Sequence, residues 1–158
     1  MKEVLECRVH IPAKSSGFTL RNQSTPATLP SIATAALKVS GAGEPPDDVP
    51  KVQQTMESEK VLDVARYPRI TFESSSVAPG RRDAATLDIV VAGQLTIRDV
   101  TQPVTVPVHV TLTDRAVAAT GRFSVKQTAF GIKPISIGGV VSVKDTLDIT
   151  FSIAARRP

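Results

Sequence analysis

The residues able to do chemistry in this chain are few and scattered. The two histidines, His10 and His109, lie far apart in the sequence, and each falls on the polar side of an alternating stretch. A general base or a metal ligand needs partners that converge on it, and the spacing brings none to either ring. With one cysteine and no paired histidines, a zinc site is not predicted. We expect two solvent-facing histidines, no metal and no cofactor.

Acidic residues and short motifs also point away from catalysis. No nucleophile-elbow or phosphate-loop pattern occurs, since Gly41-Ala42-Gly43 runs into prolines. Asp88 and Asp148 each alternate with apolar residues, so we expect both in solvent and not paired for acid–base work. Arg98-Asp99 predicts a turn with a locally paired aspartate; the alternative is a polar gate at the mouth of a barrel. The sequence names no catalytic residue, and we expect a protein that is not an enzyme.

Composition excludes further classes of function. At 158 residues, with 22% charged and 41% hydrophobic side chains, the chain is predicted to be one domain covering residues 1–158. Aromatic residues are scarce and the net charge is only +4, so base-stacking on nucleic acid is not expected. We interpret Arg81-Arg82 and Arg156-Arg157 as solvated charge; the alternative is a phosphate or membrane patch. No apolar stretch is long enough to predict a transmembrane segment.

The second half of the chain alternates strictly between apolar and polar residues. The pattern covers residues 87–98, 104–113, 117–126 and 147–153. Such alternation predicts strands with one dry face, and a sheet of that kind closes on itself or packs on another layer. The interior is then either a filled core or a container for an apolar ligand. The candidate lining residues are Ile70, Phe72, Leu87, Ile89, Val91, Leu95, Ile97, Val104, Val106, Val108, Phe123, Val125 and Phe130.

The first third of the chain has a different character. Residues 3–11 predict a strand that ends at Pro12, with Cys7 as a small buried hydrophobe on its apolar side. Residues 13–50 hold five prolines among many small residues and predict an irregular segment, in which 32–39 forms either a short helix or a strand. Asp47 or Asp48, followed by Pro50, predicts the start of one short helix that ends before Tyr67-Pro68.

Four segments, in order, resemble those of one known family. They are VLDVARYPRITFES from Val61, GQLTIRDVTQPV from Gly93, QTAFGIKP from Gln127 and GVVSVKDTLDI from Gly139. The chain is in this respect similar to YceI-like proteins. The resemblance implies a lipocalin-like antiparallel barrel that holds a long isoprenoid or fatty amphiphile in an apolar tunnel, in a protein exported to the periplasm.

The chain departs from that family pattern in three places. We expect this chain to lack the opening strands that the family has before the strand at residues 3–11. Arg98-Asp99 stands in place of a His-Gly turn, and Ala129 in place of an acidic residue. The resemblance predicts a periplasmic or secreted protein, and the start as written, which has no signal peptide, predicts a cytoplasmic one.

Together these observations predict an all-β fold, an antiparallel lipocalin-like β-barrel, either complete or open, with one short helix before Tyr67. Its expected partner is a hydrophobic small molecule, an isoprenoid or another lipid, bound without catalysis. Burial of each CH₂ group would contribute about 0.8 kcal/mol. Two alternatives remain. An exposed sheet edge would make the chain a self-associating module or homodimer, and an enzyme acting on an apolar substrate would use the same interior.

Overall fold

The computed structural model describes residues 4–8, 31–39, 47–114, 116–134, 136–137, 141–142 and 144–156. His10 and Arg157 lie outside these ranges, as does most of the segment predicted to be irregular. The predictions for the side chains of Cys7 and Arg156 also fall outside the side chains that the structure describes.

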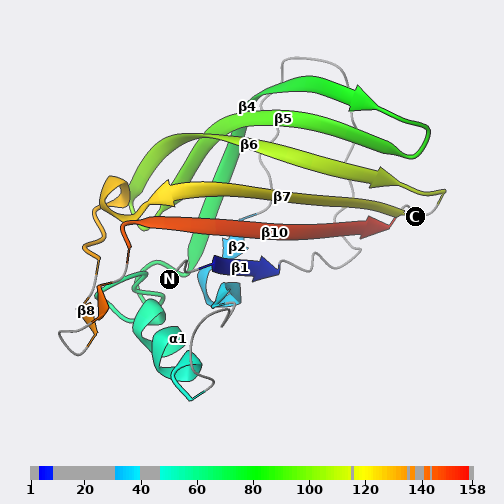
Figure 1. The fold of residues 1–158 in the computed structure, drawn as a ribbon. Helices are drawn as coiled ribbons and strands as arrows, with labels where there is room; N and C mark the ends of the chain where they lie inside the picture. The colour runs from blue at the N-terminus through cyan, green and yellow to red at the C-terminus, as the bar shows by residue number, and fades with distance from the viewer. Residues whose placement is uncertain are drawn as a thin grey trace.

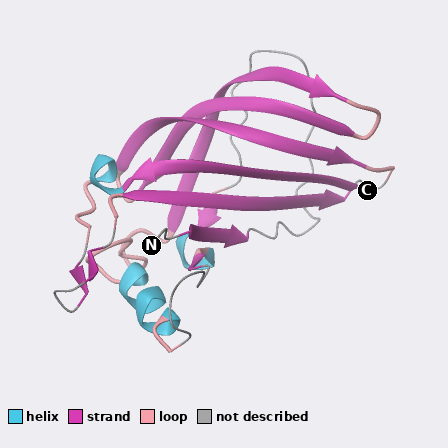
Figure 2. Cartoon of the chain, in the orientation of Figure 1, coloured by secondary structure: helices cyan, strands magenta, loops and turns pink. Residues whose placement is uncertain are grey.

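Five long strands form an antiparallel sheet that curls into a half-barrel (Figures 1 and 2). In sheet order they are β4 (Arg69–Arg82), β5 (Thr86–Ile97), β6 (Val100–Leu112), β7 (Ala116–Lys126) and β10 (Thr146–Arg156). Each neighbouring pair is antiparallel. The predicted all-β, lipocalin-like class is confirmed.

One strand pair runs against the expected antiparallel pattern. β1 (Val4–Arg8) lies beside β10 and runs parallel to it. Within the strand predicted over residues 3–11, the described part, Val4–Arg8, is a strand, but it runs parallel to its neighbour and not antiparallel. The two strands come from opposite ends of the chain, so no short hairpin connection imposes a direction on them.

A short segment occupies both ends of the sheet. β2 (Ile32–Ala33) pairs with the start of β4, and β3 (Lys38–Val39) pairs with β1. Only the 3-10 helix η1 (Thr34–Ala36) and Leu37 separate β2 from β3. The sheet order begins with β2 and ends with β3, so residues 32–39, which we call the strap, link its two ends. This is the segment for which the sequence left helix and strand open.

The strap is fixed at its centre by Thr34. Its side chain is only 1% exposed, and its Oγ1 donates a hydrogen bond to the Tyr67 carbonyl oxygen at 2.7 Å. The Thr34 backbone N–H donates to the Pro68 carbonyl oxygen at 2.9 Å. Both acceptors lie just before β4, so these bonds hold the strap against the beginning of the sheet.

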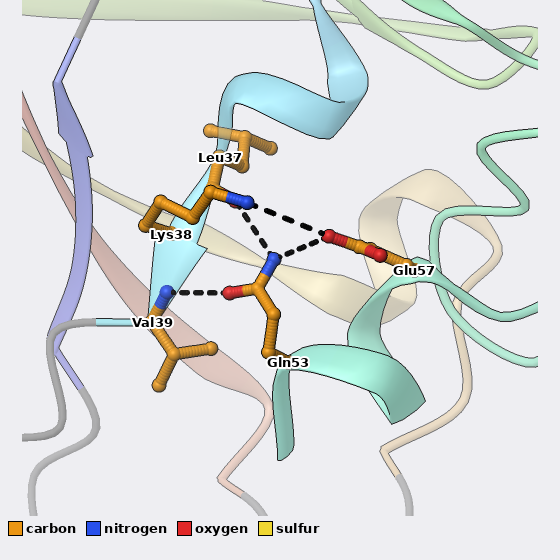
Figure 3. Close-up of polar contacts among 5 residues, drawn as sticks. All are labelled: Leu37, Lys38, Val39, Gln53 and Glu57. Carbon is orange, nitrogen blue, oxygen red and sulfur yellow. Dashed lines mark hydrogen bonds and ion pairs between the residues drawn. The ribbon is translucent and has the colours of Figure 1, made fainter. Parts of the chain in front are cut away.

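In the described part of the chain the α-helix is α1 (Val49–Glu57), which packs on the other half of the strap (Figure 3). It begins after Asp48 and has Pro50 in its first turn, as predicted. The Asp48 side chain does not cap the helix; its Oδ1 instead accepts from Lys51 Nζ at 2.9 Å. The helix ends at Glu57, before Tyr67-Pro68, and buries Met56 toward the sheet.

The sheet splits between β6 and β7. β6 pairs with β5 from Val100 to Thr111, but it pairs with β7 only from Val108 to Leu112. Proline has no N–H to donate, and β6 contains Pro103 and Pro107. The ladder to β7 begins at the residue after Pro107, so these prolines account for the split.

The core lies at one end of the half-barrel. Its buried members, which we call the core cluster, are Leu37, Met56, Val61, Leu62, Ile70, Leu95, Ile97, Val125, Phe130 and Ile132. They come from the strap, from α1 and the turns after it, from β4, β5 and β7, and from the 3-10 helix η2 (Gln127–Phe130) with the turn after it. Figure 1 shows α1, η2 and β8 (Ser136–Ile137, paired with β9, Val141–Ser142) at this end, and the β4–β5 and β6–β7 turns at the other.

Candidate ligand-binding site

The predicted lining residues of β5 and β6 share one face of the sheet. Val91 lies opposite Val106, Ile89 opposite Val108, and Leu87 opposite Val110. Residues directly opposite one another point to the same side, so the alternation predicted from the sequence is present in three dimensions. The same parity continues through β7 and β10, where Phe123 faces Ile149.

The thirteen predicted residues divide into two groups. Five belong to the core cluster, and three more pack against it as partly buried residues. These eight are Ile70, Phe72, Leu95, Ile97, Val104, Phe123, Val125 and Phe130. At this end the interior is a filled core, which was one of the two predicted outcomes.

The other five residues lie beyond the core cluster, toward the opposite end of the sheet. Together with three neighbours, these residues form a surface that we call the distal apolar face. It comprises Leu87, Ile89, Val91, Val106, Val108, Val110, Val117 and Phe151. Val106 and Val110 are buried and the other six are half-buried. Val110, Val117 and Phe151 belong to the same alternation as the predicted residues, and the periodicity of β6, β7 and β10 is the signal that identifies them.

Two phenylalanine rings lie close to glycines on this side of the sheet. A Cβ atom at Gly121 would be 2.5 Å from the ring of Phe151, which is its cross-strand partner. A Cβ atom at Gly93 would be 2.6 Å from the ring of Phe72. Each ring occupies the space of a missing side chain, so it covers backbone and extends less into the interior. Glycine is required at both positions because of this close approach.

A β-bulge changes the face of β4 part-way along the strand. Ser74 lies opposite Gly93, but the next pairs are Ser76 with Ala92 and Val77 with Val91, so one residue is inserted at Ser75. The insertion brings Val77 onto the same face as Val91. The sequence does not signal the bulge, and Val77 was not among the predicted residues.

The polar groups on the outer face pair with one another. His109 Nδ1 lies 2.6 Å from Asp88 Oδ1, and both side chains are about half exposed, which confirms the solvent-facing predictions for them. Asp148 is a correction: its side chain is only 21% exposed, and it lies 2.6 Å from Arg122 Nη2. The neighbouring strand β7 supplies Arg122 and also Ser124, whose Oγ donates to Asp148 Oδ1 at 2.5 Å. Among the described residues, no group of three His, Cys, Asp or Glu side chains could hold a metal.

The Arg98-Asp99 pair forms the turn between β5 and β6, next to the core cluster. Asp99 Oδ2 accepts from Tyr67 Oη at 3.4 Å, and the Arg98 guanidinium lies 5.3 Å from the centroid of the Tyr67 ring. The predicted turn is confirmed, although the aspartate is paired across the structure and not within the turn. The turn lies at the core end, away from the distal apolar face, and the alternative of a gate stays a prediction.

Asp145 ties η2 to the start of β10. Its Oδ1 accepts from the Thr128 backbone N–H at 2.9 Å, and its Oδ2 accepts from the Thr128 hydroxyl at 2.8 Å. These bonds to the charged form lower the pKa of the Asp145 carboxyl below its ordinary value. The buried Gln127 side chain adds a bond to the Lys144 carbonyl oxygen at 2.9 Å. These bonds hold η2 against the start of β10, at the core end of the sheet.

A family model of the YceI-like domain matches residues 22–155. The chain belongs to the YceI-like family. The segments whose sequence resembles the family contribute residues to the core end of the sheet, because Val61, Ile70 and Phe130 all belong to the core cluster. Proteins of this family are known as polyisoprenoid- and lipid-binding barrels and are typically periplasmic.

Solved structures agree with this assignment. BcnA of Burkholderia cenocepacia is 25% identical with a TM-score of 0.59, and the match covers 79% of this chain and 71% of that one. The YceI protein of Campylobacter jejuni is 11% identical with a TM-score of 0.58, over 92% of this chain and 94% of its own, and shows the fold alone. A mutant of that YceI protein was solved with a monobromobimane guest structure. No curated protein sequence matches the chain.

No helix in the described part of the chain is long and apolar enough to cross a membrane.

Proposed function

We propose that this YceI-like protein binds a long apolar or amphiphilic chain, an isoprenoid or a fatty lipid, against the distal apolar face, and carries it without catalysing a reaction. The observation behind this proposal is that the apolar face continues past the core cluster. From Val106 to Leu112 the inward residues of β6 cover about 20 Å of strand, at roughly 3.4 Å per residue. The family's known binding of hydrophobic ligands supports the same conclusion.

The chemistry of the face suits a hydrocarbon chain. Among the described residues, the inward positions of β5, β6 and β7 carry no charged side chain. The polar side chain of Gln102, also at an inward position, donates a hydrogen bond from Nε2 to the Ala129 carbonyl oxygen at 2.9 Å. Binding would therefore rest on apolar burial, at about 0.8 kcal/mol for each CH₂ group. Such a surface selects for length and slenderness of the chain more than for its functional groups. Export to the periplasm, typical of the family, would suit a carrier of this kind.

Extraction of the purified protein tests the proposal. Protein isolated without detergent should release a lipid into organic solvent, and native mass spectrometry should show the corresponding mass shift. Delipidated protein should take up an added polyprenyl alcohol or phosphate in a ratio of about one to one, as a single binding face implies. If the protein carries no lipid and takes up neither compound, the proposal is wrong.

A second candidate function is self-association through β4. Among the described residues, β2 pairs with Arg69 and Ile70, and no strand is described beside β4 on that side from Ser75 to Arg82. An edge of this length can pair with another chain. Sedimentation analysis at several concentrations separates a dimer from a monomeric carrier.

A further inference from the structure

The β4–β5 hairpin is apolar on both of its faces near the turn. Three consecutive cross-strand pairs contain no polar residue: Val77 with Val91, Ala78 with Val90, and Pro79 with Ile89. Everywhere else on β5 the outer positions are polar or small. Val77 is 57% exposed and Val90 is 41% exposed, and they are the exposed large hydrophobic residues of the described chain.

The apolar surface extends onto the neighbouring strand. Val90 lies opposite the exposed Pro107 of β6, so Ala78, Val90 and Pro107 form a row across the outer face. Val77 lies on the other face, in the row of Val91. We call residues 77–79 and 89–91 the hairpin patch.

Two arginines follow the hairpin patch at the turn. Arg81 and Arg82 end β4, and both are exposed. Arg81 Nε lies 3.6 Å from Asp83 Oδ2, between side chains that are 80% and 60% exposed, and an ion pair of this kind contributes little. Arg156 ends β10 opposite Ala116, so a further arginine belongs to the same end of the sheet.

We propose that the hairpin patch, with Arg81 and Arg82, docks on the surface of an anionic lipid bilayer. A protein partner that adds to a sheet covers one face or one edge, whereas a bilayer interface surrounds a hairpin and accommodates both apolar faces. The arginines would lie among the phosphate headgroups, where each basic residue contributes about 1 kcal/mol, or about fivefold in affinity. The hairpin carries part of the distal apolar face, so docking there would let a lipid enter without crossing water. This role rests on the proposed function.

Vesicle co-sedimentation tests the docking surface. The full chain should bind vesicles of phosphatidylglycerol and phosphatidylcholine more tightly than vesicles of phosphatidylcholine alone, and added salt should weaken the binding. Arg81→Gln/Arg82→Gln should reduce affinity for anionic vesicles about 25-fold at low salt. Val90→Ser should also weaken binding, and it should do so at high salt as well. The matched control is Lys51→Gln/Lys60→Gln, which removes two exposed charges near α1 and should change little.

Lipid uptake from solution separates this proposal from the proposed function. Val90 lies on the outer face, Lys51 and Lys60 lie near α1, and Arg82, although it pairs with Leu87, is exposed at the turn. We therefore expect the three variants to take up an added polyprenyl alcohol like the wild type. If wild-type protein takes up lipid but does not bind anionic vesicles, the docking proposal is wrong and the proposed lipid-binding function still stands. Vesicle binding that falls equally in the control and the arginine variant also overturns it, because the attraction would then be general. A dimer that forms through the hairpin and is lost in Val90→Ser would assign the patch to a second copy instead.

Discussion

The side-chain amide of Gln53 hydrogen-bonds to the backbone at Val39, where a neighbouring strand would otherwise pair (Figure 3). Its Oε1 accepts from the Val39 backbone N–H at 3.0 Å, while its Nε2 donates to the Leu37 carbonyl oxygen at 3.0 Å. One amide thus satisfies both a donor and an acceptor on the outer edge of β3. Nε2 also donates to Glu57 Oε1 at 2.6 Å, and Lys38 Nζ lies 3.8 Å from the same oxygen. Gln53 therefore couples α1 to the strap and protects the last edge of the sheet.

Removing the Gln53 amide should loosen the strap. Gln53→Ala leaves the Val39 N–H and the Leu37 carbonyl without these partners, and we expect the free energy of unfolding to fall by about 2 kcal/mol. Urea denaturation measures the change. The control is Gln54→Ala, because Gln54 is the exposed neighbour on the same helix and should have almost no effect. Equal losses in the two variants would show that helix propensity, and not the clamp, is responsible.

Adding a methyl group at position 121 should displace the Phe151 ring. Gly121→Ala brings a Cβ atom within 2.5 Å of that ring and 2.8 Å of the Pro107 carbonyl oxygen. We expect a loss of about 1–3 kcal/mol, as for other overpacked sites. Phe151→Leu in the same chain should recover part of the loss, and thermal unfolding of the two single variants and the double variant measures the coupling. Additive effects would mean that the ring does not lie over Gly121.

Acid should release the bond between Asp145 and η2. Because the pKa of Asp145 is lowered in the folded protein, the unfolded chain binds more protons at moderately acid pH. The stabilisation is complete above the ordinary aspartate range, near pH 4, and is lost as pH falls through the lower folded value. Asp145→Asn should therefore be less stable than wild type at pH 7, and the difference should shrink toward pH 3. Asp114→Asn, at an exposed turn position, is the control; a constant difference between Asp145→Asn and wild type across this range would contradict the assignment.

A carboxylate on the inner face should abolish lipid loading. Val108→Asp places a charge within the distal apolar face, and we expect lipid occupancy to fall about tenfold or the domain to unfold. Thr105→Asp puts the same group on the exposed face of the same strand and should leave both properties unchanged. If Val108→Asp does not fold, Val108→Thr, which keeps the shape of the side chain but adds a hydroxyl group, tests the same position. Extracted lipid per protein is the measurement, and equal loading in all three variants would show that the face assignment is wrong.

The sequence by itself determined the strands and the side of each that is dry. The period-two alternation on β5, β6, β7 and β10 gave the correct inward residues, because a side chain's face depends only on its position along a strand. The start of α1 and the turn at Arg98-Asp99 also followed from local residue types. Resemblance over four segments identified the family, which the family model then showed.

Only the tertiary structure decided how the sheet ends and where its interior is filled. The strap joins β4 to β1 through pairs between residues more than 30 positions apart, and no periodicity marks so short a segment. The bulge at Ser75, the parallel pairing of β1 and the position of Gln53 against Val39 depend likewise on distant neighbours. The division of one apolar stripe into a filled core and a distal apolar face follows from where α1 and η2 pack. Local pattern fixes which way a side chain points, whereas contacts between distant segments fix what it meets.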